Sequence, residues 1–166
     1  MRLIHSIWLL MILGLWGCSE HPLFEENQDI ENASWKMDQP KHFEFEVTDT
    51  VSVFNFFVNI RNGQEYPFSN IYLFVDMEDP HGEKSRDVIE CKLANEHGEW
   101  LGSGVGTIKE NRLLFATHQF RKYTANKENT YGVPGRYKID ISHGMRVDDL
   151  TGIYDIGLRI SKKNPN

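Results

Sequence analysis

The histidine and carboxylate side chains that could bind a metal or transfer protons are spread along the sequence without a catalytic spacing. No two of the 7 histidines stand three or four residues apart with a carboxylate between them, so a zinc motif such as His-Glu-x-x-His is absent. The Gly-x-Ser-x-Gly segment of a hydrolase nucleophile is also missing. An enzyme would therefore need groups brought together from separate strands. The residue types predict a protein that is not an enzyme and uses no metal or cofactor.

Two short segments have the composition of binding loops but not their spacing. Residues 76–83, DMEDPHGE, group four carboxylates at a turn, but Pro80 and His81 stand where a calcium loop needs oxygen ligands. Residues 102–107, GSGVGT, have the glycines of a phosphate loop, but TIKENRLLF follows, which reads as strand, turn and strand rather than helix. We interpret the first segment as a solvated hairpin end. The second is interpreted as a strand that a neighbour approaches closely.

Cys18 is the residue whose context predicts a covalent modification. It follows Arg2 and the apolar run 7–16, which is too short to cross a hydrocarbon core because a helix needs about 20 residues to do so. A basic start, a short apolar centre and a small residue at the end indicate an export signal.

The last residues of this signal, Leu15-Trp16-Gly17-Cys18, resemble the lipobox of bacterial lipoproteins. In such signals the cysteine sulfur receives a diacylglyceryl group, and the chain is cut just before the cysteine. The resemblance implies that Cys18 begins the mature protein and, with further acylation such as palmitate, anchors it to a membrane. The alternative is an ordinary signal peptide with a chance cysteine.

The charge of the chain argues against several classes of partner. Lys and Arg number 18, Asp and Glu number 24, and the net charge is −6. Because phosphate binding needs basic clusters, this balance argues against nucleic acid and against electrostatic adhesion to anionic lipid. With Cys18 acylated, Cys91 has no partner in the chain. Its place in an alternating run beside Ile89 and Leu93 predicts a buried thiol.

The elements that must position any site are strands. Apolar and polar residues alternate through most of the chain, with turn residues such as Arg61-Asn62-Gly63 between the runs. This pattern predicts a single all-β antiparallel β-sandwich of about eight strands, with an up-and-down barrel as the alternative. A short helical turn is expected within residues 144–152. The expected strands lie at 42–47, 51–60, 70–77, 86–93, 105–109, 112–120, 136–143 and 153–161.

The domain boundaries follow from these segments. We expect a signal peptide at 1–17, a lipidated N-terminus and tether at 18–41, the β-sandwich at 42–162 and a tail at 163–166. The tether is polar and non-periodic, and Trp35 is expected to dock its end on the domain. Fully extended, about 20 residues would reach on the order of 65 Å, far enough to lift the domain clear of a membrane.

Three long segments together resemble one family. VNIRNGQEYPFSNIYLFV (58–75), LANEHGEWLGSGVGTIKENRLLF (93–115) and GRYKIDISHGMRVDDLTGIYDIGLRIS (135–161) closely resemble the gliding-motility lipoprotein GldH family of the Bacteroidota, in order and with the lipobox cysteine in the expected place. The resemblance implies a non-enzymatic cell-envelope lipoprotein required for gliding. It also implies a binding or assembly role in gliding machinery that is linked to type IX secretion. The motif residues taken as candidate partner contacts are Asn59, Arg61, Asn62, Trp100, Met145 and Arg146.

Two further signals gain meaning from this resemblance. Asp49-Thr50-Val51 resembles the envelope O-glycosylation signal of that phylum, which makes Thr50 a candidate modification site. The residues after Cys18, SEHP, lack the acidic runs that resemble a surface-export tag in these bacteria. We therefore expect an outer-membrane anchor and a domain that faces the periplasm.

A second function, from a different class, follows from aromatic residues outside the alternating core. A periplasmic carbohydrate- or ligand-binding β-sandwich would use a groove lined by Tyr66, Phe68, Trp100 and Tyr131. Clustering of these four side chains in one concave patch would favour that function.

Overall fold

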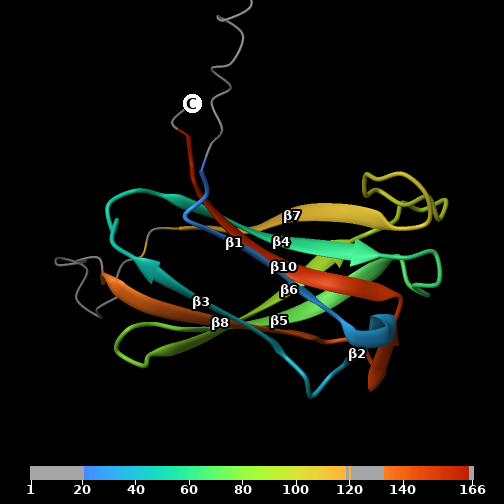
Figure 1. The fold of residues 1–166 in the computed structure, drawn as a ribbon, viewed down its shortest axis with the longest axis horizontal. Coiled ribbons are helices and arrows are strands. Elements are labelled where there is room, and N and C mark those ends of the chain that lie inside the picture. Colours follow the sequence, from blue (N-terminus) through green and yellow to red (C-terminus); the bar gives the residue numbers. More distant parts are fainter. Residues whose placement is uncertain (1–20, 119, 121–132, 165–166) are drawn as a thin grey trace, which may run out of the picture.

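The structure is a computed structural model that describes residues 21–118, 120 and 133–164 (Figure 1). In this part of the chain no helix is long and apolar enough to cross a membrane. The described residues form ten strands and one 3-10 turn: β1 (Phe24–Asp29), η1 (Glu31–Ala33), β2 (Ser34–Lys36), β3 (Lys41–Val47), β4 (Phe54–Asn62), β5 (Asn70–Glu78), β6 (Lys84–Lys92), β7 (Lys109–His118), β8 (Gly135–His143), β9 (Asp149–Thr151) and β10 (Ile153–Lys162).

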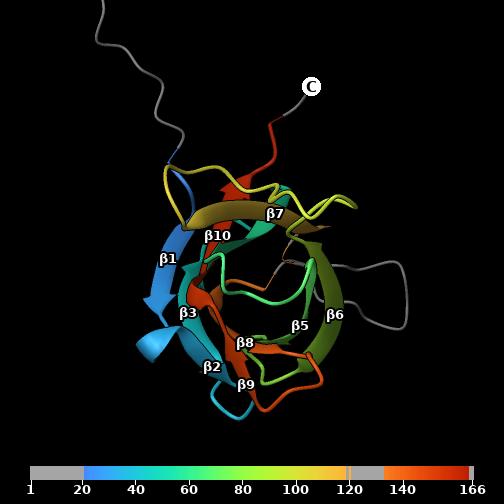
Figure 2. The ribbon, with the colours of Figure 1, turned by 90° about the vertical axis from the view of Figure 1, so that its right-hand side faces the viewer.

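Eight of these strands form two four-stranded antiparallel sheets. One sheet has the order β1-β10-β4-β7 and the other β3-β8-β5-β6, while β2 and β9 pair as a separate two-stranded ribbon. The predicted antiparallel all-β sandwich is therefore confirmed. A chain that passes between two four-stranded sheets in this order has the double Greek key connectivity of a jelly roll. Figure 2 shows the strands of both sheets wrapping around a shared interior.

The core lies between the two sheets because one face of each strand is apolar. On β4 the buried face carries Phe56, Val58 and Ile60, and on β8 it carries Ile139 and Ile141. Rings from the two sheets meet directly across the core. Phe24 of β1 contacts Phe45 of β3, with their ring centroids 5.4 Å apart. This packing fixes which side chains point outward, and so where a polar site can form.

The expected tether at 18–41 is wrong from Leu23 onward. Residues 24–29 form β1, which pairs with β10 at the edge of a sheet, and the backbone N–H of Leu23 already donates to Ile160 O. Trp35 does dock on the domain, as predicted, because its side chain is 1% exposed. The N-terminal part is thus an integral part of the sandwich.

Two smaller expectations also change. Lys109–His118 is one continuous strand, where two strands separated by a turn were expected. Residues 149–151 form the strand β9, where a helical turn was expected, and the 3-10 turn lies at Glu31–Ala33 instead. β7 pairs with β4 and β9 pairs with β2. Because these partners are distant in sequence, the local pattern of residues does not predict the pairing.

Candidate functional site

The outer face of the β1-β10-β4-β7 sheet carries polar side chains in rows that run across all four strands. In one row, Asp29 of β1 pairs with Asp155 of β10, Asp155 pairs with Arg61 of β4, and Arg61 pairs with Glu110 of β7. Neighbours in such a row have side chains close enough to interact. The row thus gathers three carboxylates around one guanidinium.

A β-bulge in β10 places Asp155 on this outer face. Ile153 and Ile156 both point into the core, which a regular alternation does not allow for residues three apart. The register shifts between Ile153 and Asp155, and Tyr154 is the additional residue. Bulges commonly re-aim a side chain next to a functional site. Here the shift brings Asp155 opposite Arg61.

Asp155 is a buried acid held by one arginine. Its side chain is 2% exposed, and Arg61 Nε donates to its Oδ2. Burial raises the pKa of Asp155, whereas the hydrogen bond and charge of Arg61 oppose that rise. The same contact raises the pKa of Arg61. The Oδ1 atom of Asp155 is buried and has no hydrogen-bond partner within the described residues.

The neighbouring row is a chain of amide hydrogen bonds. Asn59 Nδ2 donates to Asn27 Oδ1 at 3.2 Å, and Arg112 Nε donates to Asn59 Oδ1 at 2.9 Å. Gly157 lies between the two asparagines in the register, and a Cβ there would stand 1.6 Å from Asn27 Oδ1. A glycine at this place lets the Asn27 side chain cross β10 and reach Asn59.

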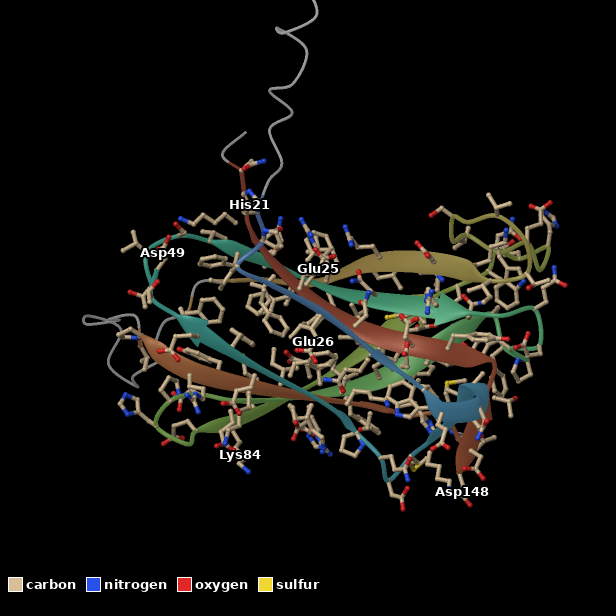
Figure 3. All side chains as sticks on the ribbon, in the orientation of Figure 1. His21, Glu25, Glu26, Asp49, Lys84 and Asp148 are labelled. Carbon is tan, nitrogen blue, oxygen red and sulfur yellow. The ribbon has the colours of Figure 1, made fainter. Side chains whose placement is uncertain are left out.

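Glu25 lies in the next row, opposite Arg159. It accepts a hydrogen bond from Arg112 Nη2 at 2.6 Å and another from Arg159 Nη1. Figure 3 shows Glu25 in the layer formed by β1, β10, β4 and β7. These contacts hold both arginines against the sheet.

The glycine-rich loop before β7 covers one side of the rows. The backbones of Ser103 and Glu110 exchange two hydrogen bonds, and Asn111 Nδ2 donates to Asn62 Oδ1 at 2.9 Å. A Cβ on Gly102 would stand 2.8 Å from Asn111 Oδ1, so only glycine lets the loop approach this closely. The predicted close approach at this segment is confirmed, although the loop residues do not form a strand.

Together the rows and the loop enclose an open groove of about 480 Å³. It is lined by the row of Asp29, Asp155, Arg61 and Glu110, with Asn59 and Ser103 at its side. The polar side chains at its base are nearly inaccessible to water and are held by hydrogen bonds. We take this groove, called here the acid–amide groove, as the candidate functional site.

Five of the six predicted contact residues divide into three groups, and the sixth, Trp100, packs against Tyr66. Asn59 and Arg61 lie in the acid–amide groove. Asn62 is fully buried and holds Asn111, which is a structural contact. Met145 and Arg146 line a different hollow of about 570 Å³, and the backbone N–H of Tyr72 donates to Met145 Sδ. The role of these residues in partner binding stays a prediction.

The aromatic residues proposed to line a ligand groove are used in packing. The ring centroid of Tyr66 lies 5.8 Å from that of Phe68 and 6.3 Å from that of Trp100, so these three do gather. However, Tyr66 is buried, its hydroxyl donates to Asn70 O, and the other two rings pack against the core. Tyr131 lies outside the described residues. Phe68 also lines the hollow that Met145 and Arg146 line, and carbohydrate or ligand binding stays a prediction.

The remaining predicted sites are placed as follows. Cys91 is buried and burial raises its pKa to about 12, which confirms its predicted core position. Thr50 sits in a turn that Asp49 Oδ1 stabilises by accepting from the backbone N–H groups of Val51 and Ser52. Cys18 lies outside the described residues. Within the described residues, no group of three or more His, Cys, Asp or Glu side chains is arranged to hold a metal.

Sequence reasoning missed most of the groove. The alternation in β10 identified Ile156 and Leu158 as core, but its outer face, Asp155 and Gly157, was not considered. On β4, the polar residues of the outer face were taken as candidates. The same criterion applied to β10 identifies both Asp155 and Gly157. Asn27 and Asp29 were hidden because β1 is polar on both faces, which resembles a linker.

Comparison with known proteins identifies the family. The model for the GldH lipoprotein matches residues 22–160, which begin before β1 and end within β10. The "Gliding motility lipoprotein GldH homolog" of Christiangramia forsetii is 31% identical over 166 residues, covering 95% of this chain and 94% of that protein. The "Gliding motility lipoprotein GldH" of Flavobacterium johnsoniae is 33% identical over 172 residues, covering 99% of this chain and all of that protein.

A solved structure is similar only at low level. Dimeric latent PorU from Porphyromonas gingivalis is 11% identical and matches with a TM-score of 0.34 over 88% of this chain and 14% of that one. A superposition at this score supports no statement about function. The family model and the two relatives confirm the resemblance found in the sequence: the chain belongs to the GldH lipoprotein family.

Proposed function

We propose that this chain is a non-enzymatic lipoprotein of the cell envelope that acts in gliding motility. In this proposal it is a binding or assembly component of gliding machinery linked to type IX secretion. The observation that carries the proposal is the family match, which spans residues 22–160 and so includes both sheets of the sandwich. The two relatives, named as gliding motility lipoproteins or their homologue, align along nearly their full length.

The acid–amide groove is the surface through which we propose that the protein binds its partner. Two of the family's motif residues, Asn59 and Arg61, point into it from β4. A patch of polar groups that a rigid sheet holds in fixed rows is preorganised, so little conformational entropy is lost on binding. Surface residues that only keep a sandwich soluble need no such network.

Anchoring follows from Cys18. We propose that a diacylglyceryl group on its sulfur, with further acyl chains, holds the protein to the outer membrane with the domain in the periplasm. Each buried CH₂ contributes about 0.8 kcal/mol, so two or three acyl chains on one residue give stable attachment. Thr50 remains a candidate O-glycosylation site in this proposal.

Cross-linking in living cells, followed by mass spectrometry of the captured proteins, tests the proposal. We expect the native chain to capture envelope proteins of the gliding or secretion machinery. The Cys18→Ala variant should leave the membrane fraction and capture none of them. Capture of no such component from detergent-solubilised envelopes would contradict the proposed role, and a membrane-bound, motile Cys18→Ala strain would contradict the anchor.

A further inference from the structure

The row at the centre of the acid–amide groove carries an excess of negative charge. Asp29, Asp155 and Glu110 share one cation, Arg61, which leaves an excess of two negative charges. Asp29 stands directly opposite Asp155 in the register of β1 and β10. Like charges in directly opposite positions destabilise a sheet. The isolated domain therefore keeps an arrangement that a further cation would stabilise.

The carboxylates of this row have unused hydrogen-bonding capacity. Asp155 lines the groove and is almost fully buried, yet its Oδ1 atom has no partner within the described residues. The exposed carboxylates of Asp29 and Glu110 likewise pair with no side chain in the described part of the chain, and both interact with Arg61 only through space. A buried acceptor without a donor costs free energy, and a nearby cation offsets part of that cost.

The other cations of this face are not available to meet that need. Arg112 is engaged by Glu25 and by Asn59, and Arg159 is engaged by the same glutamate. Arg61 uses its Nε atom on Asp155, and its side chain is 42% exposed. Lys41 Nζ donates to the backbone oxygen of Asp29 at 2.8 Å and forms no ion pair with the Asp29 carboxylate. A further cation for the row would therefore come from outside the described chain.

An amide beside the row suits a peptide. Asn27, which lines the groove, uses its oxygen to bind Asn59, and this leaves its NH₂ group to donate. The carbonyl oxygen of a peptide group is an acceptor for that donor.

We propose that the acid–amide groove binds a lysine or arginine side chain of a partner protein, with the adjoining peptide backbone held by Asn27. This inference deepens the proposed function, on which it rests, by naming the chemistry of the partner. The cation lies over the row, where the negative charges of Asp29, Asp155 and Glu110 attract it. A metal ion is the less suitable occupant, since no group of three acids in the described residues is arranged to ligate one.

Peptide binding to the full-length lipoprotein in non-ionic detergent tests this inference. The probes are acetyl-Gly-Gly-Arg-Gly-Gly-amide and the same peptide with citrulline, which has the shape of arginine without its charge. Lysine and norleucine peptides form a second matched pair. We expect each charged peptide to bind at least about tenfold more tightly than its neutral partner, with an affinity that falls as salt rises.

Substitutions localise the binding. Asp29→Asn and Glu110→Gln change exposed side chains and keep their shape, so the fold is preserved; each is expected to weaken the charged peptides at least about fivefold. Asp155→Asn should weaken them further. Asp87→Asn, at an exposed position of edge strand β6, is the matched control and should change nothing.

Three outcomes would overturn the inference. These are equal binding of charged and neutral peptides, no binding of any peptide up to millimolar concentration, and saturable Ca²⁺ binding that the same substitutions abolish without any preference for arginine. The proposed function fails separately. If gliding components are captured in cells and any of these outcomes is also found, the proposed envelope role stands. Only the inference that the groove binds a basic side chain is then disproved.

Discussion

At the scale of single residues, the pair of Arg61 and Asp155 combines an acid removed from water with a cation that remains half exposed. Breaking such a pair costs more than the pair itself contributes, because the buried carboxylate is then left without compensation. Whether Asp155 is ionised decides the size of that cost. The pair therefore links the charge of the groove to the stability of the sheet.

Replacing Arg61 with glutamine is expected to lower the free energy of unfolding by about 2 kcal/mol at neutral pH. Without Arg61 the pKa of Asp155 rises further, since both effects that lower it come from that arginine. An acid whose folded pKa exceeds its unfolded value loses stability as pH rises through the folded pKa. The difference in the free energy of unfolding between the native chain and Arg61→Gln should thus shrink as pH falls toward about 4. Urea unfolding of both proteins at several pH values measures this difference.

Arg86→Gln is the matched control for this prediction. Arg86 forms a two-bond pair with Asp76 on the other sheet, but both side chains are exposed. Exposed pairs contribute about 0–1 kcal/mol. An equal loss of stability in the two variants, or a loss for Arg61→Gln that does not depend on pH, would contradict this account of Asp155.

At the scale of elements, the β2–β9 ribbon is fastened to the sandwich by Trp35 and His143. The Trp35 side chain is fully buried, and its Nε1 donates to Gln39 O at 2.9 Å. His143 Nε2 lies 3.1 Å from Trp35 O, and the two rings meet edge to face at 5.4 Å. The ribbon thus depends on one indole and one imidazole.

Trp35→Ala is expected to destabilise the domain by about 3–5 kcal/mol, because removing a large buried ring leaves a cavity. Met37→Ala, two residues further on at a position 40% exposed, is the control and should cost well under half as much. Chemical unfolding of both variants gives the comparison. Similar stability of the two would mean that residues 34–36 are a tether after all.

His143 makes the ribbon sensitive to pH. Burial lowers the pKa of His143 below its ordinary value of 6.5, against the opposing effects of the Trp35 and Asp148 carbonyls and the Asp149 charge. As pH falls below about 6.5 the unfolded chain binds a proton that the folded chain resists, so stability is lost by up to about 1.4 kcal/mol per pH unit.

His143→Gln removes the titrating group while keeping a donor for Trp35 O. We expect this variant to lose less stability than the native chain between pH 7 and pH 5, whereas His97→Gln, in an exposed turn, should follow the native profile. Parallel native and His143→Gln profiles would show that another group causes the pH dependence.

The strands that sequence could predict are those with one apolar and one polar face. In β4 and β8 the alternation of Phe56, Val58 and Ile60, or of Ile139 and Ile141, decides both the strand and its orientation. β1 was missed because an edge strand with polar side chains lacks that signal. The groove was missed because it depends on the bulge at Tyr154 and on pairings such as Asp29 with Asp155, which are far apart in sequence.

At the scale of the whole molecule, the strand β1 shortens the distance between anchor and domain. Leu23 is already hydrogen-bonded to β10, so if Cys18 carries the lipid only about five residues remain, and they span at most about 18 Å. The domain is then held at the membrane surface, where the longer tether would have lifted it away. Figure 3 shows His21 on the side of the molecule opposite Lys84, and Figure 1 shows the chain after β10 leaving the domain on the same side as the start of the described chain.

This geometry predicts which residues approach the bilayer. In vesicles that hold a headgroup quencher, a fluorophore on Lys163→Cys should be quenched strongly and one on Lys84→Cys weakly, with Cys91 too buried to react. Inserting about 20 Gly/Ser residues between Glu20 and His21 should reduce the difference between the two labels. Equal quenching in the chain without the insertion would contradict a short connection.

The central claim is that the acid–amide groove is the surface through which this envelope lipoprotein meets its partner. The most direct test is photocross-linking in living cells from p-benzoylphenylalanine at Ser103, an exposed residue on the rim of the groove, with Val88 on the opposite sheet as control. We predict that Ser103 captures an envelope protein of the gliding or secretion machinery, that Val88 does not, and that Glu110→Gln weakens the capture. The same proteins captured from both positions, or no such protein captured from Ser103, would contradict the claim.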